Sequence, residues 1–334
     1  LRAPAGLTVA RAELRVWSAM RILGGPYLRR TFHAIAVGRV EVVTEGILTR
    51  RLQQDPELEG VGLVIGNQGA NFSVGANLML LAVALAEGAL EDIDLVVRAF
   101  QKATMAVKYA RVPVVTAPFN MTLGGGCEFS LHADRINAYA ETYMGLVEIG
   151  VGLLPAGGGC LNLWRKFLAS VPAAVTDLDL AKFFIPVFMS IAMAKVSMSA
   201  AEARANGFLG PNDRIVFNRD YLIGEAKKEV LKMLDDGYAP PVKGKIKVLG
   251  QAAQGMVAAQ ISDMCSGGFI SEYDAFLARR IAYVISGGDV RDNAEVTDDV
   301  ILSLERRAFI DFLKEEKTLA RIEHMLKTGK PLRN

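Results

Sequence analysis

Cysteine and proline are scarce in this sequence of 334 residues, and neither positive nor negative charge is in clear excess. Its three cysteines, Cys127, Cys160 and Cys265, are too few and too scattered for a disulfide framework or a zinc cluster, which favours a reducing cytoplasm. The 38 Lys and Arg residues nearly balance the 36 Asp and Glu residues, so the chain has no strong field that would attract nucleic acid. Because 51% of the residues are hydrophobic and only 12 are proline, the composition excludes a disordered or collagen-like chain and predicts a large buried core.

Long hydrophobic runs are also missing. A membrane span needs about 20 apolar residues, and the two best candidates fall short, because Leu78–Ala86 stops at Glu87 and Phe183–Ala194 contains Pro186. The sequence therefore predicts no membrane span. The opening stretch shows no apolar run with the cleavage site of a signal peptide. The first residue is Leu1 rather than Met, which suggests a piece of a longer protein.

Short apolar runs bounded by glycine alternate with glycine-rich loops and helical patterns through the first half of the chain. A helix is expected over residues 41–52, a long helical stretch over 78–109 with a break near Gly88, and a helix over 127–134. Buried strands are expected between them, at residues 62–66, 112–117 and 135–140. Strand, glycine loop and helix in repetition predict an α/β fold.

Helical patterns dominate after Gly159. Ser199 followed by Glu202 fits a capping box, and Gly207 is expected to end that helix. Residues 237–247 are typical of a linker, and the charged stretch Glu305–Lys327 is typical of a solvated or subunit-contacting helix. We therefore divide the chain into an N-terminal segment (1–31), an α/β core (32–196) and a helical C-terminal region (197–334).

Two glycine loops are the first chemical signal. Leu123–Gly126 follows a predicted strand and opens a helix, so its backbone N–H groups are placed to face a ligand atom. A packing turn is the commoner explanation for one such triplet. The loop Phe72–Asn77 has the same setting, however, and two loops of this kind can direct two N–H donors at one carbonyl oxygen.

Two glutamates in apolar, glycine-rich surroundings are the second signal. Glu128 lies just inside a predicted helix and Glu148 lies in a short loop, where burial would suit a carboxylate to proton transfer. Taken singly, a favourable helix-dipole position explains Glu128 and solvent exposure explains Glu148 equally well. The three histidines, His33, His132 and His324, form no ligand cluster, so no metal site is expected. A phosphate-binding loop and a dinucleotide fingerprint are absent from the sequence as well.

These residues together resemble the enoyl-CoA hydratase/isomerase (crotonase) family. The turn and helix start Leu123–Glu128 are similar to that family's glycine turn and first catalytic glutamate, and Glu148 with its following loop is similar to the second. The loop Phe72–Asn77 is similar to the other oxyanion loop, and Ser199–Leu209 to the helix that follows the core. Residues from about 57 to 334 resemble the hydratase half of bacterial bifunctional fatty-acid oxidation proteins, in which a 3-hydroxyacyl-CoA dehydrogenase half comes first.

The resemblance implies a spiral of strand-strand-helix units followed by a helical region, and an enoyl-CoA hydratase that adds water to an acyl-CoA thioester without cofactor or metal. It implies that Glu128 and Glu148 are catalytic, that the N–H groups of Ala76 and Gly125 form the oxyanion hole, and that Ala156 lies in the water and substrate loop. All these groups are expected to converge in one pocket. The implied assembly is a homotrimer or hexamer in the cytoplasm, with a 3-hydroxyacyl-CoA dehydrogenase domain or subunit as partner.

The sequence departs from the family pattern at three positions. Ala156 stands where the family usually has a glycine, and its methyl group is costly if the position needs positive φ. Asn77 and Met79 replace the usual Asp and Lys, so no CoA contact is assigned there. Two alternatives therefore stay open: a Δ3-to-Δ2 enoyl-CoA isomerase, which needs one well-placed carboxylate, and a non-catalytic assembly module.

Overall fold

The structure is a computed structural model that describes residues 33–36, 62–169, 171–172, 175 and 178–334. The expected helix over 41–52 and the whole predicted N-terminal segment, residues 1–31, lie outside the described residues. The described chain forms two compact units. Unit 1 contains the described residues up to Gly75, Arg98–Met144 and Ser197–Lys243, and unit 2 contains Ala76–Val97, Gly145–Val196 and Gly244–Asn334.

A five-stranded sheet forms the centre of unit 1, in the order β1-β2-β3-β5-β8. The edge strand β1 is antiparallel to β2, and the other neighbours are parallel, with Val64 opposite Val115 and Thr116 opposite Ile136. The strands are His33–Ala36 (β1), Leu63–Gly66 (β2), Val114–Thr116 (β3), Arg135–Tyr139 (β5) and Arg214–Val216 (β8). Parallel strands are buried on both faces, which explains why β2 and β3 are short, almost wholly apolar runs.

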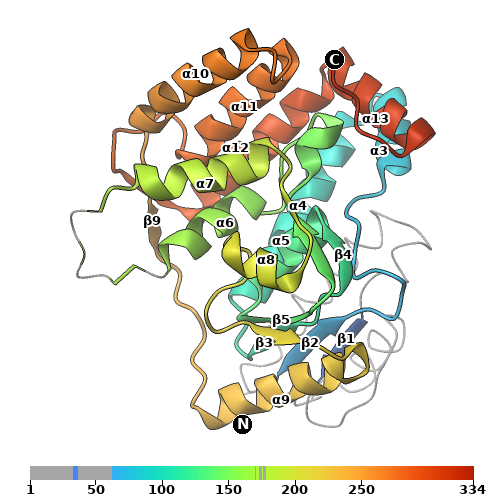
Figure 1. The fold of residues 1–334 in the computed structure, drawn as a ribbon, viewed down its shortest axis with the longest axis vertical. Coiled ribbons are helices and arrows are strands. Elements are labelled where there is room, and N and C mark those ends of the chain that lie inside the picture. The colour runs from blue at the N-terminus through green and yellow to red at the C-terminus, as the bar shows by residue number, and fades with distance from the viewer. Residues whose placement is uncertain (1–32, 37–61, 170, 173–174, 176–177) are drawn as a thin grey trace, which may run out of the picture. The chain divides into compact units, whose positions relative to one another are not determined.

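Helices cover this sheet and complete the core of unit 1. Helix α9 runs across β2, β3 and β5 (Figure 1), and its Ala226 and Val230 are fully buried against the sheet residues. Phe129 of α5 and Val107 of α4 join the same core cluster. The helical elements of this unit are Gly125–His132 (α5), Ala200–Ala205 (α8), Arg219–Tyr221 (η2), Leu222–Asp235 (α9) and the second half of Leu90–Lys108 (α4).

Three short strands build a second sheet, in the order β4-β6-β7. They are Asn120–Leu123 (β4), Thr142–Gly145 (β6) and Val196–Ser197 (β7), and the unit boundaries fall in β6 and β7. The sequence patterns did not reveal these strands, because two to four residues are too few to show a period.

Unit 2 is mainly helical. Helices α10, α11 and α12 lie side by side, and α13 lies beside α3 (Figure 1). Its helices are Leu78–Ala86 (α3), the first half of α4, Glu148–Val151 (η1), Gly159–Leu168 (α6), Ala181–Ala192 (α7), Gln251–Ser266 (α10), Glu272–Ile285 (α11), Asp298–Leu313 (α12) and Glu316–Thr328 (α13). Among the described residues, every helix is too short or too polar to cross a membrane.

Most predicted elements of the described region are confirmed, including the three buried strands, the break near Gly88 and the α/β class. Ser199 caps α8 by accepting a hydrogen bond from the Glu202 N–H, and Gly207 has the positive φ of a helix end. The carboxylate of Glu202 accepts from the N–H of Met198, so only half of the predicted capping box forms in its usual way.

One prediction about the C-terminal region is confirmed in part, and one is wrong. The predicted linker does join two helices, α9 and α10, but its last three residues form the strand Lys245–Lys247 (β9), which pairs with Glu295–Thr297 (β10). The stretch 305–327, predicted as one solvated or subunit-contacting helix, belongs to two helices, α12 and α13, in which Glu305 and Arg321 are 0% exposed. The charge pattern predicted exposure of these two side chains, but both are buried because they bond to partners far away in the sequence.

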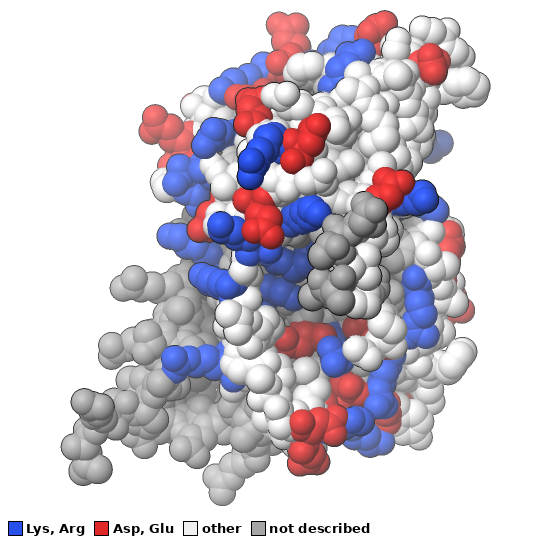
Figure 2. Space-filling view, turned by 90° about the vertical axis from the view of Figure 1, so that its left-hand side faces the viewer, with Lys and Arg blue, Asp and Glu red and all other residues white. Residues whose placement is uncertain are grey.

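Charged side chains of both signs are interspersed on the face shown in Figure 2. Such mixing agrees with the nearly balanced composition of 38 basic and 36 acidic residues. Any anionic ligand must therefore be held by local groups rather than by an overall field.

Ala194, at the end of α7, has φ of 49°, a left-handed conformation that disfavours a side chain. The turn is set by hydrogen bonds from the N–H groups of Ala194 to Ile191 and of Lys195 to Ser190. Ala194→Gly is expected to raise the free energy of unfolding by about 0.5–1 kcal/mol, since relief of strain exceeds the added entropy of the unfolded chain. Urea denaturation measures this change. Ala192→Gly, inside the helix, should instead destabilise, and equal effects of the two variants would refute the strain.

Candidate active site

The two predicted glycine loops meet within unit 1. Ser73 forms a parallel bridge with Thr122 on β4, with the Ser73 N–H donating to Met121 O at 3.0 Å and the Leu123 N–H to Ser73 O at 2.9 Å. A methyl group built on Gly75 would lie 3.5 Å from the backbone nitrogen of Gly125. The residue before Ala76 therefore lies directly beside the start of α5.

Glycine is required at this junction for two different reasons. Gly75 and Gly124 have φ of 91° and 53°, which a residue with a side chain rarely adopts. Gly126 has ordinary helical geometry, but a methyl group there would lie 2.5 Å from the Ser73 Cβ, so the loops touch only because the side chain is absent. The spacing between the loops is thus set by missing side chains.

The N-terminus of α5 faces this junction. The first N–H groups of a helix have no partner within it, and they carry the positive end of the helix dipole. Gly125 is the first residue of α5, so its N–H is available as the predicted oxyanion donor. The other predicted donor, Ala76, directly follows Gly75 and precedes Asn77, whose side chain caps α3 by accepting from the N–H groups of Met79 and Leu80.

Glu128 is buried in the first turn of α5. It is 3% exposed and lies between Cys127 and Phe129, which are 0% and 2% exposed. Its backbone carbonyl accepts a hydrogen bond at 2.6 Å from the ring of His132. The His132 ring thus bonds within its own helix.

The far end of α5 is fixed to the sheet by Asp134. Its carboxylate accepts hydrogen bonds from the Val114 N–H at 2.8 Å and from the Tyr238 hydroxyl at 3.1 Å. Burial raises the pKa of Asp134 above its ordinary value, and these two hydrogen bonds oppose that rise. Helix α5, with Glu128 on it, is thereby anchored to β3.

Glu148 belongs to unit 2 and begins the short helix η1. The residue is partly buried, and its Oε2 atom is out of contact with solvent. The left-handed Gly152 ends the turn, with φ of 77°. Because Glu128 lies in unit 1, the meeting of the two carboxylates stays a prediction.

The loop that carries Ala156 is held by a buried carboxylate that the sequence patterns do not reveal. Glu305 of α12 accepts hydrogen bonds from the N–H groups of Gly158, at 2.8 Å, and Leu161, at 2.9 Å. A carboxylate in this place satisfies donors at the start of α6 and complements its dipole. Ala156 is 6% exposed, and it is not among the described non-glycine residues with positive φ, so its methyl group causes no backbone strain.

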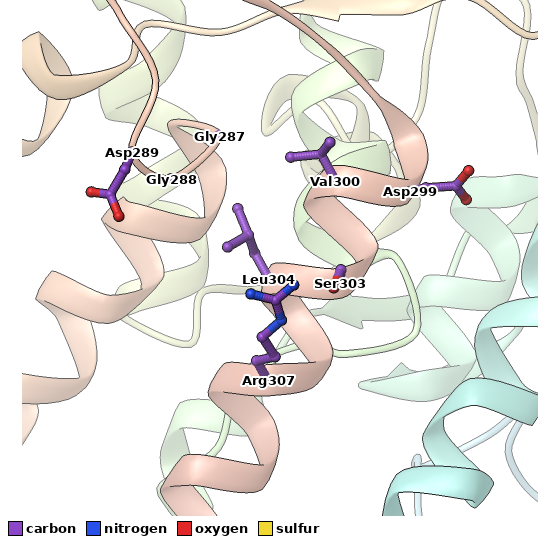
Figure 3. A pocket seen from close by; sticks show the side chains of 8 residues that line it. All are labelled: Gly287, Gly288, Asp289, Asp299, Val300, Ser303, Leu304 and Arg307. Atoms are coloured by element: carbon purple, nitrogen blue, oxygen red, sulfur yellow. The ribbon is translucent and has the colours of Figure 1, made fainter.

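A separate hollow of about 420 Å³ lies in unit 2, between the turn after α11 and the first half of α12 (Figure 3). Asp289, Ser303 and Arg307 are among its lining residues, and none of the predicted site residues is. The Tyr283 hydroxyl donates to Asp289 at 2.7 Å, and this hydrogen bond raises the pKa of Tyr283. Within the described part of the chain, no group of three His, Cys, Asp or Glu side chains is placed to hold a metal ion.

No family model matches the chain. It is 42% identical over 302 residues, 90% of its length, to a "Probable 3-hydroxyacyl-CoA dehydrogenase" of Bacillus subtilis, and it covers 37% of that protein. It is 25% identical over 271 residues to a "Putative fatty acid oxidation complex trifunctional enzyme" of Rickettsia felis, covering 81% of this chain and 34% of that protein. The chain thus spans about a third of the length of these relatives.

The fold matches a solved structure that is distant in sequence. An enoyl-CoA hydratase from Bacillus halodurans superimposes with a TM-score of 0.51 and 14% identity, over 82% of this chain and 86% of that one. This match confirms the predicted fold of the chain, an α/β core followed by a helical C-terminal region.

Proposed function

This chain has the fold of an enoyl-CoA hydratase, and from this premise we propose that it belongs to the enoyl-CoA hydratase/isomerase (crotonase) family and hydrates trans-2-enoyl-CoA to 3-hydroxyacyl-CoA. One observation carries the proposal: a buried glutamate, Glu128, in the first turn of a helix that starts where two glycine loops meet. Burial of a carboxylate is energetically unfavourable, and a role in proton transfer beside an oxyanion hole would explain why one is buried here.

The oxyanion hole lowers the barrier by stabilising charge that develops in the reaction. Attack of water on C3 moves electrons onto the thioester oxygen, giving an enolate-like state. The N–H groups of Ala76 and Gly125 would bind that oxygen more strongly than the ground-state carbonyl, by about 3–4 kcal/mol per donor. The close packing of the two loops at Gly75 and Gly126 supports this role, because donors held in place by packing need little reorganisation during the reaction.

The two glutamates would divide the proton transfers. Glu128 holds the water and accepts one of its protons as the oxygen bonds to C3, and Glu148 donates a proton to C2. Each turnover therefore leaves Glu128 protonated and Glu148 ionised, and a proton passes back through solvent before the next cycle. Ala156 lies in the loop that would border the water. The proposed chemistry uses no cofactor and no metal.

A direct assay separates this function from its alternatives. The purified chain should add one water to crotonyl-CoA with a turnover on the order of 10 s⁻¹, detected by mass spectrometry as a 3-hydroxy thioester. A 3-enoyl-CoA offered in parallel should react more slowly. Rapid double-bond migration without hydration would favour the isomerase, and no reaction with either substrate would favour the non-catalytic module.

The names of the relatives suggest the setting of this reaction. We propose that the chain is the hydratase portion of a larger fatty-acid oxidation protein, or acts beside a 3-hydroxyacyl-CoA dehydrogenase. Hydration produces the hydroxyl group that a dehydrogenase oxidises, so the two activities would act in sequence. The expected assembly is a homotrimer or a hexamer.

A further inference from the structure

We infer that Thr318 and Arg321 of α13 are positioning residues for Glu148, an inference that rests on the proposed function. Both side chains are 0% exposed, and they lie one helical turn apart on the same face of α13. Each donates a hydrogen bond to a backbone carbonyl of the turn that begins with Glu148.

The turn depends on external support because it is so short. Helix η1 has four residues, and its internal bonds include one from the Leu153 N–H to the Glu148 carbonyl at 3.0 Å. Short helical segments of this kind are marginal without tertiary contacts. The position of the Glu148 carboxylate is therefore set by whatever holds the backbone around it.

Thr318 holds the end of the turn. Its hydroxyl donates to the Gly152 carbonyl at 2.8 Å, and it lies 2.6 Å from the Tyr273 hydroxyl. A threonine hydroxyl has one proton, so Tyr273 must be the donor in the second bond. A methyl group built on Gly152 would lie 2.6 Å from Thr318 Oγ1, which shows that α13 packs directly on the turn.

Arg321 holds the middle of the turn. Its Nη1 donates to the Ile149 carbonyl at 3.3 Å and to Asp274 Oδ1 at 2.9 Å, while its Nε donates to Asn334 Oδ1 at 2.8 Å. Three partners thus hold the guanidinium, through its Nη1 and Nε atoms. Two carbonyls of the Glu148 turn are therefore held by one helix, and a misplacement of about 1 Å at a catalytic group can lower a rate about 100-fold.

The test compares Thr318→Val, which removes the hydroxyl, with Thr318→Ser, which keeps it. Thr318→Val should lower kcat for crotonyl-CoA hydration at least tenfold with KM changed less than twofold, and Thr318→Ser should stay within threefold of the wild type. Thr328→Val is the control, because Thr328 is exposed on the same helix and, within the described part of the chain, its hydroxyl bonds to its own turn and the following segment.

Hydrogen exchange gives a second measurement that does not need activity. In Thr318→Val, the amides of residues 149–153 should exchange at least tenfold faster, while those of α11 and α12 stay unchanged. Unchanged kcat in Thr318→Val, or an equal loss in Thr318→Ser, would overturn the inference. If the wild type shows no hydration, the proposed function fails, and exchange alone then decides whether Thr318 holds the turn.

Discussion

Glu148→Gln and Glu128→Gln are each expected to lower kcat for crotonyl-CoA hydration by about 10²–10⁴-fold, the usual contribution of a general acid or base. Glutamine keeps the size of the side chain and removes its ability to exchange a proton. Folding should be preserved, because a neutral amide is less costly to bury than the carboxylate of Glu128, which is 3% exposed. Steady-state kinetics with circular dichroism measures both effects.

Glu91→Gln is the matched control for these variants. Glu91 also lies in the first turn of a helix, α4, but it is exposed, so its replacement should leave turnover unchanged and cost a few tenths of a kcal/mol at most. Wild-type turnover in both active-site variants would reject the assignment. A loss in only one of the two variants would instead show that hydration depends on a single carboxylate.

Local patterns in the sequence were enough to predict the two glycine loops that lie together in unit 1. Glycines after a buried strand predicted both loops, and the structure brings these loops together through the bridge of Ser73 with Thr122. The sequence could not show why Gly126 must be glycine, since the reason is the Ser73 side chain more than fifty positions earlier. Such a contact exists only after the chain has folded.

The residues that hold the Glu148 turn and the Ala156 loop could not be predicted, for the same physical reason. Glu305 and Arg321 look like surface residues of amphipathic helices, because nothing nearby in the sequence marks them as buried. Their partners are the N–H groups of Gly158 and Leu161 for one, and Asp274 for the other. A buried charge is tolerated only when distant groups satisfy it, and periodicity carries no information about those groups.

Asp274→Asn is expected to destabilise unit 2 by about 3–5 kcal/mol at neutral pH, the usual cost of breaking a buried ion pair from one side. The Asp274 carboxylate, with its side chain 4% exposed, pairs with Arg321 at 2.9 Å and with Arg333 at 3.0 Å. It also accepts from the Ser271 N–H at 3.2 Å, which completes the capping box of α11. Asparagine would leave the fully buried Arg321 guanidinium without its carboxylate.

The pH dependence of this effect follows from the pKa of Asp274. Burial raises that pKa, but the hydrogen bonds from Arg321 and Ser271 and the charges of Arg321 and Arg333 outweigh it, so the pKa lies below the ordinary 3.8. A carboxylate whose pKa is lowered by folding stabilises the fold at any pH above its ordinary, unfolded-state pKa. This stabilisation is lost as the pH falls through the lower pKa of the folded state. The difference between wild type and Asp274→Asn should therefore shrink in acid.

Urea denaturation measures this difference when it is followed by the fluorescence of Trp164, which is 0% exposed in unit 2. The variants are made in a Trp17→Phe background, so that Trp164 is the sole tryptophan of the sequence. The control is Asp311→Asn, because Asp311 pairs with Arg280 where the two side chains are 49% and 37% exposed. Such a surface pair should contribute at most about 1 kcal/mol. Equal losses in the two variants, or a loss in Asp274→Asn that does not shrink in acid, would show that the charge of Asp274 does not stabilise unit 2.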